Sequence, residues 1–329
     1  MNEKKNVWQK LMAKQGMGQV ITAFCGVIIL MIIFTIMNQN FASAHNLMSL
    51  LRQICPYLLV GIGQAYVCIT GNIDLSIGSV IGMSSMISAT LMCNGLHPVA
   101  AILVAFVACM AVGVINGILV GKFKLPPFIA TLGTMTIGRG IAQIVNGNYN
   151  TGDIGTGAAE TFRNVFYYGK TLGIYNGVWI TLIVWLIFNF ILSSTKSGRH
   201  IYAIGSNADA ARLSGVDVFK TTTKAYLVSA FCAFLTGLIV TASSGMGAMD
   251  AGTSYEMYAV ASAVIGGVST LGGSGLLVGV IAGAGVWAVL QNGLTFANAP
   301  VAIRNIVIGV IVVICVLMDI LRKNGTRKS

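Results

Sequence analysis

A polar segment at residues 71–79 is the first place in this chain where side chains could do chemistry. Its sequence, GNIDLSIGS, sets the carboxylate of Asp74 between two strongly apolar runs. A charged group beside hydrocarbon is unfavourable, so such residues usually face a bundle interior or an aqueous path. Gly71 permits a break in a helix, and Asn72 or Asp74 can cap the helix that follows, which we favour over direct contact with a substrate. The predicted helix break or path lining comprises Asn72, Asp74, Ser76 and Gly78.

A second stretch, residues 198–217, combines helix signals with basic charge. In its sequence, GRHIYAIGSNADAARLSGVD, Asn207 is a suitable N-cap and the following Ala-Asp-Ala-Ala-Arg-Leu run favours helix. Gly215 ends this helix in a left-handed conformation. A helix of about seven residues is marginal alone, because nucleation is not offset by so few hydrogen bonds. Either a partner orders the helix by docking, or the stretch is a loop with incidental helix, and the residues alone leave both interpretations open.

The third stretch, residues 255–275, is rich in small residues and glycine. It begins Tyr-Glu-Met-Tyr, and Gly266 and Gly267 interrupt its apolar run, which predicts a broken or partial crossing. The sequence SAVIGGVSTLGGSGLLVG at 262–279 also faintly resembles VCITGNIDLSIGSVIG at 67–82. An internal repeat is therefore a possible feature of the chain.

The composition determines which elements must position these stretches. Of the 329 residues 56% are hydrophobic and only 9% are charged, whereas a soluble domain has about a quarter charged residues. Only lipid can solvate such a surface. We predict an all-α, polytopic membrane bundle of about ten segments. The predicted segments are 19–37, 48–70, 75–93, 98–120, 127–145, 177–194, 224–244, 257–271, 276–294 and 304–321.

The net charge of +11 is placed in a way that indicates membrane topology and excludes a nucleic-acid partner. Fifteen of the 20 Lys and Arg residues fall before the first segment, at 122–124, at 196–224 and after residue 321. Basic residues on alternate connections are typical of the cytoplasmic side. Ten crossings then place both termini, 1–18 and 322–329, in the cytoplasm. The loop 196–222 is also predicted inside, and 146–176 is predicted as the main external loop.

Enzymatic chemistry is not indicated by any motif. The chain has no P-loop of the form GxxxxGK(S/T), no Ser-His-Asp set, no paired catalytic carboxylates and no metal-ligand spacing. We therefore predict a protein that is not an enzyme and that needs no cofactor or metal. Its basic N-terminus precedes an apolar run long enough to span, so we expect a retained helix in place of a cleaved signal peptide.

The order and spacing of the three stretches resemble the permease subunits of ribose-, galactose- and xylose-type ABC importers. GNIDLSIGS matches the family's GxIDLSxGS signature, and GRHIYAIGSNADAARLSGVDV is similar to its cytoplasmic motif. PPFIATLGTMTIGRG at 126–140 and the run through IGGVSTLGG are also similar to family segments. The resemblance covers about residues 40–320. The chain departs from the family at Tyr258, where an acid is common, at Ser274, where a base is common, and at Asn72, where glycine is frequent.

The resemblance implies a division of labour between subunits. The ABC permease domain, 19–321, would form the path for a monosaccharide in the cytoplasmic membrane of a prokaryote, as a pair with a second copy or a paralogue. An extracytoplasmic sugar-binding protein would deliver the ligand, and a cytoplasmic ABC ATPase subunit would hydrolyse ATP. Ala210 and Ala211 would give the ATPase a small-residue docking face. The ATPase-coupling residues would be Tyr202, Gly205, Asn207, Ala210, Ala211, Arg212, Ser214 and Gly215.

Two other functions use the same residues differently. An ion-coupled secondary transporter would employ Asp74 as its coupling carboxylate, although it gives the 207–215 helix no role. An ABC permease for another small polar solute, such as a nucleoside, an autoinducer-like sugar or a branched-chain amino acid, would keep every structural expectation and change only the substrate.

Overall fold

Long helices make up almost all of the protein. The computed structural model describes residues 17–300 together with 302–304, 306–307, 309–311, 313–314 and 317. Helical residues continue at described positions between 302 and 317. The helices that form the bundle are α2 (Met17–Met37), α3 (Ala44–Ile69), α4 (Ile77–Cys93), α5 (Pro98–Gly117), α6 (Pro127–Ile144), α8 (Asn176–Ser194), α11 (Val218–Ser244), α12 (Tyr255–Ile265) and α13 (Leu277–Phe296).

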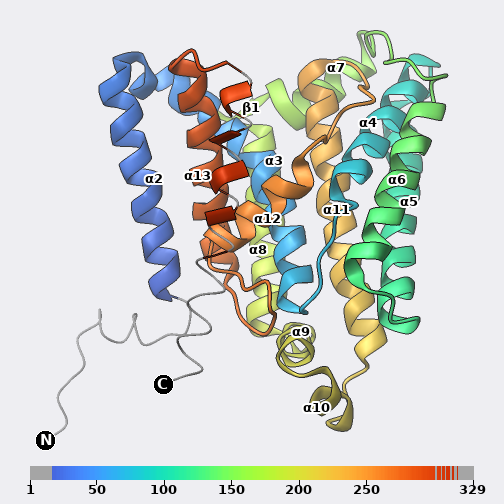
Figure 1. Cartoon of the computed structure of the whole chain (residues 1–329). Coiled ribbons are helices and arrows are strands. Elements are labelled where there is room, and N and C mark those ends of the chain that lie inside the picture. The colour runs from blue at the N-terminus through green and yellow to red at the C-terminus, as the bar shows by residue number, and fades with distance from the viewer. Residues whose placement is uncertain are drawn as a thin grey trace, which may run out of the picture.

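Short elements connect these helices at the two ends of the bundle (Figure 1). One end carries α9 (Lys196–Ser206) and α10 (Ala208–Leu213). The opposite end carries α7 and a two-stranded antiparallel hairpin. The remaining short elements are η1 (Gln39–Ala42), the π-helical turns η2 (Ile118–Lys122) and η3 (Asn164–Tyr168), α7 (Ala158–Arg163), β1 (Lys170–Thr171) and β2 (Ile174–Tyr175).

The bundle has a buried centre and an apolar outer surface. Helix α11 packs against α3, α4 and α5, while α13 packs against α2, α3 and α12. Glycines allow the backbones to approach closely, since a methyl group on Gly113 would lie 2.8 Å from the side chain of Ala230. Helices α2, α5 and α8 instead leave most of their apolar side chains exposed or only half-buried. Such a surface suits lipid, and among the described residues five helices, counting α5 with η2 as one, have the length and composition to cross a membrane.

Two of the predicted crossings are only partly helical. Helix α3 has 26 residues, but α4 has only 17 and follows the non-helical segment 70–76. In the same way α11 has 27 residues, whereas α12 has 11 and follows the non-helical segment 245–254. Figure 1 shows both non-helical segments running inside the bundle. Each thus brings the N-terminal end of a short helix into the interior.

A helix overlaps each of the first nine predicted segments, although α11 begins six residues before its segment and α12 ends six residues before the end of its segment. The tenth, 304–321, and the tails 1–18 and 322–329 fall wholly or mostly outside the described residues. The stretch 146–176, predicted as the main external loop, is polar and glycine-rich, and among its few apolar residues Ile154, Ala159 and Phe162 are buried. Its hairpin also makes the protein not purely α-helical. In the loop 196–222, residues 196–206 form a helix that was not predicted.

Candidate functional site

The carboxylate of Asp74 ties the break between α3 and α4 to α11. Asp74 is only 2% exposed. Its Oδ1 accepts hydrogen bonds from the backbone N–H and the hydroxyl of Ser76, at 2.9 and 2.6 Å. Its Oδ2 accepts one from the hydroxyl of Ser229 on α11, at 2.7 Å. Three donors on two elements therefore satisfy a carboxylate that would otherwise be very unfavourable in this interior.

The predicted capping role is wrong in its details. Ser76, and not Asp74, is the N-cap of α4, and the Ser76 side chain accepts no hydrogen bond from the first turn of that helix. Asn72 points elsewhere, since its amide donates to the hydroxyl of Thr70 at 2.8 Å. Asp74 instead accepts a hydrogen bond from the backbone two residues further on, at Ser76, and another from Ser229 of α11. It therefore holds the break against α11.

Further polar side chains extend the Asp74 contacts through the bundle. The amide of Asn116 on α5 donates to the Ser76 hydroxyl at 2.9 Å. The Asn116 carbonyl oxygen accepts from Thr134 on α6 at 2.7 Å. The Tyr226 hydroxyl on α11 donates to the backbone carbonyl of Ile73 at 3.1 Å. This network joins the break to three helices, and each member has a partner, which favours one rigid arrangement.

The first turns of α4 and α12 meet inside the bundle, next to an acid and a base. A methyl group on Gly78 would overlap the Glu256 carboxylate and would lie 2.5 Å from the Gly252 carbonyl oxygen. Arg139 of α6 donates to the backbone carbonyl of Ala251 at 2.6 Å. Glu256 Oε2 is buried, and no residue in the described part of the chain donates a hydrogen bond to it. Two helix N-termini, each with positive dipole character, thus face one another here.

Helix α9 makes backbone contact with both broken crossings through three glycines. A methyl group on Gly205 would overlap the carbonyl oxygen of Ile69, where α3 ends. Gly272 has φ +88°, and a methyl group there would lie 2.7 Å from the Gly205 carbonyl oxygen and 2.9 Å from the Gly71 nitrogen. The N–H of Gly273 donates to the Ile69 carbonyl at 2.9 Å. We call Gly71, Gly205 and Gly272 the glycine junction.

The loop after α12 contacts α9 a second time. Helix α12 ends at Ile265, Gly266 is its C-cap, and Gly267 has φ +85°. The loop then runs to the glycine junction, and the Tyr202 hydroxyl of α9 donates to the backbone carbonyl of Gly275 at 2.6 Å. Gly266 and Gly267, which the sequence predicted to interrupt a crossing, therefore lie where α12 ends and the chain turns toward α9.

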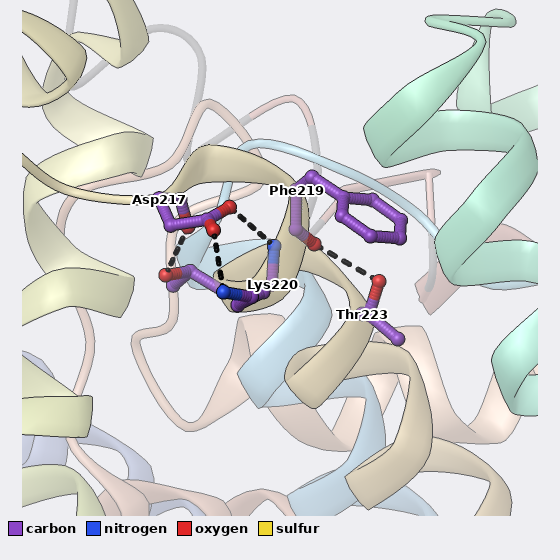
Figure 2. A network of polar contacts seen from close by, with 5 residues as sticks. Asp217, Phe219, Lys220 and Thr223 are labelled. Atoms are coloured by element: carbon purple, nitrogen blue, oxygen red, sulfur yellow. Dashed lines mark hydrogen bonds and ion pairs between the residues drawn. The ribbon is translucent and has the colours of Figure 1, made fainter.

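Helices α10 and α11 have well-formed N-terminal caps. The side chain of Asn207 accepts from the N–H groups of Asp209 and Ala210, at 3.0 and 2.9 Å. Figure 2 shows the next cap, in which Asp217 accepts from the backbone N–H of Lys220 at 2.9 Å and pairs with its ammonium at 3.3 Å. The bond from the Lys220 N–H lowers the pKa of the Asp217 carboxyl.

The remaining predicted residues close α10. Arg212 pairs with Asp209 at 3.5 Å, and the Ser214 hydroxyl donates to the Ala210 carbonyl at 3.0 Å. Gly215 follows with φ +83°, as its position after the helix predicts.

The orientation of α10 contradicts the predicted docking face. Ala211 is only 5% exposed and faces the chain's own bundle, so it is not available to a partner. Ala210 and Arg212 are exposed, and Leu213 is 91% exposed. A large apolar side chain that protrudes this far from a six-residue helix is the feature a docking subunit would bury.

A cavity of about 670 Å³ at the end of the bundle that carries α10 lies between α10 and the break between α3 and α4. Asn72 from the break, Arg212 from α10 and Phe219 from α11 line it together with Lys124. The cavity therefore connects the surface that carries α10 with the segment that leads to Asp74.

Comparison with known proteins decides the family. Residues 46–316 match the family described as branched-chain amino acid transport system / permease component. The chain belongs to this family. No solved structure matches it.

Curated relatives align over nearly the whole chain. The ribose import permease protein RbsC of Bacillus subtilis is 35% identical over 312 residues, 94% of this chain and 96% of the relative. RbsC of Haemophilus influenzae is 36% identical over 310 residues, 93% and 94% of the two chains. The D-allose transport system permease protein AlsC of Escherichia coli is 34% identical over 299 residues, 91% and 90% of the two chains. The permease is thus a multi-pass inner-membrane transport subunit and not an enzyme.

Sequence reasoning missed the residues of this permease that form hydrogen bonds across the bundle with the two non-helical segments. Ser229, Asn116, Thr134 and Tyr226 hold the break in place, and Arg139 holds the segment before α12. A single polar residue inside an otherwise apolar segment, such as Asn116 within 98–120, was the available signal. It does not reveal which other helix supplies the partner.

Proposed function

We propose that this permease forms the membrane path for a monosaccharide, with an ABC ATPase subunit bound at α9 and α10. The observation that carries the proposal is the glycine junction, because it places α9 in backbone contact with both broken crossings. A movement of α9 cannot leave the end of α3 or the loop after α12 unchanged, since packed backbones transmit displacement. The predicted coupling residues from Tyr202 to Gly215 have this role.

The two broken crossings are the moving parts of the proposed path. On one side of the glycine junction, segment 70–76 connects it to the first turn of α4. On the other side, the loop that follows α12 connects the junction to the C-terminal end of α12, whose first turn lies at the opposite end of that helix. These two turns meet at Gly78 and Gly252. A shift at the junction therefore changes the interior contact between the turns, which would open the path on one side and close it on the other. Asn72, Ser76, Gly266 and Gly267 lie along this connection.

The topology that fits this mechanism has ten crossings and cytoplasmic termini. The beginning of α2 lies at the same end of the bundle as α9 and α10 (Figure 1). The short helices α4 and α12, each after a long helix and a non-helical segment, also favour an inverted repeat of five plus five segments. In this repeat, α4 of the first half corresponds to α12 of the second half. The sequence similarity between 67–82 and 262–279 suggests a different correspondence, in which the break before α4 corresponds to the loop before α13.

The partners follow from the type of transport system. An extracytoplasmic sugar-binding protein would dock at the end that carries α7 and the β1–β2 hairpin, opposite α10. A second permease copy or a paralogue completes the path, and lipid covers the apolar outer faces of α2, α5 and α8. The relatives are named for ribose and D-allose, which favours a monosaccharide over a branched-chain amino acid.

The test is uptake by proteoliposomes that contain the permease, its ATPase and its binding protein. We expect import of a monosaccharide from a panel of pentoses and hexoses, only with ATP inside and only with the binding protein present. Leucine should not be imported. Uptake that continues without ATP and collapses with an uncoupler would instead establish an ion-coupled transporter.

A further inference from the structure

A cavity of about 280 Å³ lies among α3, α11, η3 and the first turn of α12, apart from the Asp74 network and the glycine junction. Drug-sized ligands occupy pockets of about 300–1,000 Å³, so this one suits a somewhat smaller molecule. It sits nearer the end opposite α9 and α10, because it includes the outer part of α3 and residues of η3. The side chains that matter to the argument are Arg52, Tyr57, Tyr167, Ser243 and Tyr255.

Stacked aromatic rings form one rigid wall of this cavity. The rings of Tyr57 and Tyr255 are stacked, with centroids 5.9 Å apart and planes at 23°. Behind them Tyr258 meets Tyr57 edge-on at 5.6 Å, and Trp287 meets Tyr57 edge-on at 6.5 Å. Such packing fixes the ring positions, so the wall presents flat apolar faces with hydroxyl groups at their edges.

The guanidinium of Arg52 is held in place but is not neutralised. It lies 3.9 Å from the ring centroid of Tyr175 and 4.8 Å from that of Tyr167. Its Nε is buried and donates no hydrogen bond to any residue that the structure describes. The salt bridges among the described residues are both at the opposite end, near α10. Arg52 therefore keeps donors for a ligand.

The hydroxyl groups around the cavity also lack partners within the described part of the chain. Tyr57, Tyr255 and Ser243 line the cavity, and no described residue forms a hydrogen bond with their hydroxyl groups. Elsewhere in the bundle tyrosine hydroxyls are used for packing, since Tyr66 donates to the Phe188 carbonyl at 2.6 Å and Tyr226 donates to a carbonyl at 3.1 Å. The three hydroxyls that line this cavity suit a ligand that exchanges many hydrogen bonds.

We propose that this cavity binds one monosaccharide on its way through the permease, a site that rests on the proposed function. A sugar ring has an apolar C–H face, which fits the Tyr57–Tyr255 wall, and a rim of hydroxyls, which fits Arg52, Ser243 and the tyrosine hydroxyls. A branched-chain amino acid could place its carboxylate on Arg52. Its ammonium group would then be unpaired, because no Asp or Glu lines the cavity.

Hydroxyl deletions test the site without removing the aromatic wall. In the proteoliposomes described above, Tyr57→Phe, Tyr255→Phe and Ser243→Ala should each lower the uptake rate about three- to tenfold, the effect of one hydrogen bond of roughly 0.5–1.5 kcal/mol. Stimulation of ATP hydrolysis by the loaded binding protein should not change, because the ATPase contacts remain. Tyr149→Phe is the matched control, since Tyr149 is exposed in the external loop, and its uptake should equal that of the wild type.

Labelling of Ser243→Cys gives a second, independent measurement. Millimolar amounts of the transported sugar should slow its reaction with a small thiol reagent, whereas leucine should not. The native Cys93 is exposed at the end of α4 and serves as an internal control, because its labelling should not respond to the sugar.

The outcomes separate this site from the proposed function. If the wild type imports no monosaccharide, the proposed function fails. If the wild type imports one, but the three hydroxyl-deletion variants transport normally and the sugar does not protect the thiol introduced by Ser243→Cys, the function stands and the site is wrong. Protection by leucine in place of the sugar would overturn the ligand class.

Discussion

At the scale of single residues, one carboxylate braces the break that defines the site. Asp74 accepts three hydrogen bonds, and all of its partners are hydroxyl or backbone donors on segment 70–76 or α11. No basic side chain neutralises it in the described structure. The position therefore needs acceptor oxygens at fixed points more than it needs a charge.

Replacing Asp74 by asparagine should preserve much of this geometry. The amide oxygen can keep both bonds from Ser76, and the amide nitrogen can donate to Ser229, whose hydroxyl also accepts. We expect Asp74→Asn to keep ATP-driven uptake within about tenfold of the wild type, whereas Asp74→Ala should lower the stability by about 2–4 kcal/mol, since buried donors lose their acceptor. Uptake and the thermal midpoint of the purified protein measure the two effects. Asp153→Asn in the external loop is the control, and a complete loss of uptake in Asp74→Asn would show that the charge itself is required.

The sequence identified Asp74 but not what it contacts. A carboxylate between apolar runs signals an interior position, and the GNIDLSIGS pattern places the break correctly. Ser229 is 155 residues away along the chain, and nothing in its local sequence distinguishes it from other serines of the apolar helices. Cross-bundle pairing depends on how helices pack, which single-sequence patterns do not specify.

At the scale of elements, the proposed coupling depends on α9 and α10, which lie at one end of the bundle (Figure 1) and contact its interior through the glycine junction. The caps of α10 were predictable, because an N-cap asparagine and a left-handed glycine are local signals. Helix α9 could not be predicted from the sequence, because only Gly198, Ile201 and Ile204 of its 11 residues are buried and this short apolar stripe lies in a basic segment. The face of α10 was also predicted wrongly, because burial of Ala211 depends on the neighbouring helices.

Leu213 is the side chain by which α10 should bind the ATPase subunit. Burial of a leucine stabilises by about 1.5–3 kcal/mol, so Leu213→Glu should weaken ATPase binding tenfold or more. Co-purification of the ATPase with the tagged permease measures this. Leu172→Glu provides a matched control, because Leu172 is 88% exposed at the opposite end, against 91% for Leu213. Equal ATPase recovery from both variants would remove α10 from the interface.

Gly205 should separate ATPase binding from transport. A methyl group there would overlap the Ile69 carbonyl oxygen and would lie 2.6 Å from the Gly273 nitrogen, and backbone atoms cannot rotate away. We expect Gly205→Ala to co-purify with the ATPase normally and to import at least about tenfold more slowly, since a displacement of only about 1 Å can have an effect of this size or larger. Gly133→Ala on α6, where a methyl group meets nothing within 4 Å, should transport normally. Normal uptake by Gly205→Ala would exclude the glycine junction as the coupling contact.

At the scale of the whole molecule, the proposed function depends on which end of the bundle faces the cytoplasm. The positions of most helices followed from apolar length, and the placement of basic residues led to one proposed orientation. Composition could not show that α12 has only 11 helical residues or that α7 and η3 of the stretch 146–176 pack on α11, because both depend on tertiary contacts.

Reporter fusions test the orientation directly. Fusions at the N-terminus, within 146–176 and after Lys323 should report inside, outside and inside, as expected for ten crossings. A fusion after Lys196 should report the same side as the N-terminus. A C-terminal fusion that reports outside would contradict the topology and the assignment of α10 to the cytoplasm.

The hydrogen bond between Asp74 and Ser229 can form only late in synthesis of the chain. The two residues are 155 positions apart, and chains grow at about 5–20 residues per second, so roughly 8–30 s pass between their appearance on the ribosome. For that interval one oxygen of a carboxylate that is buried in the finished bundle lacks its partner Ser229. The newborn chain must therefore keep segment 70–76 near water, or near the insertion machinery, until α11 arrives.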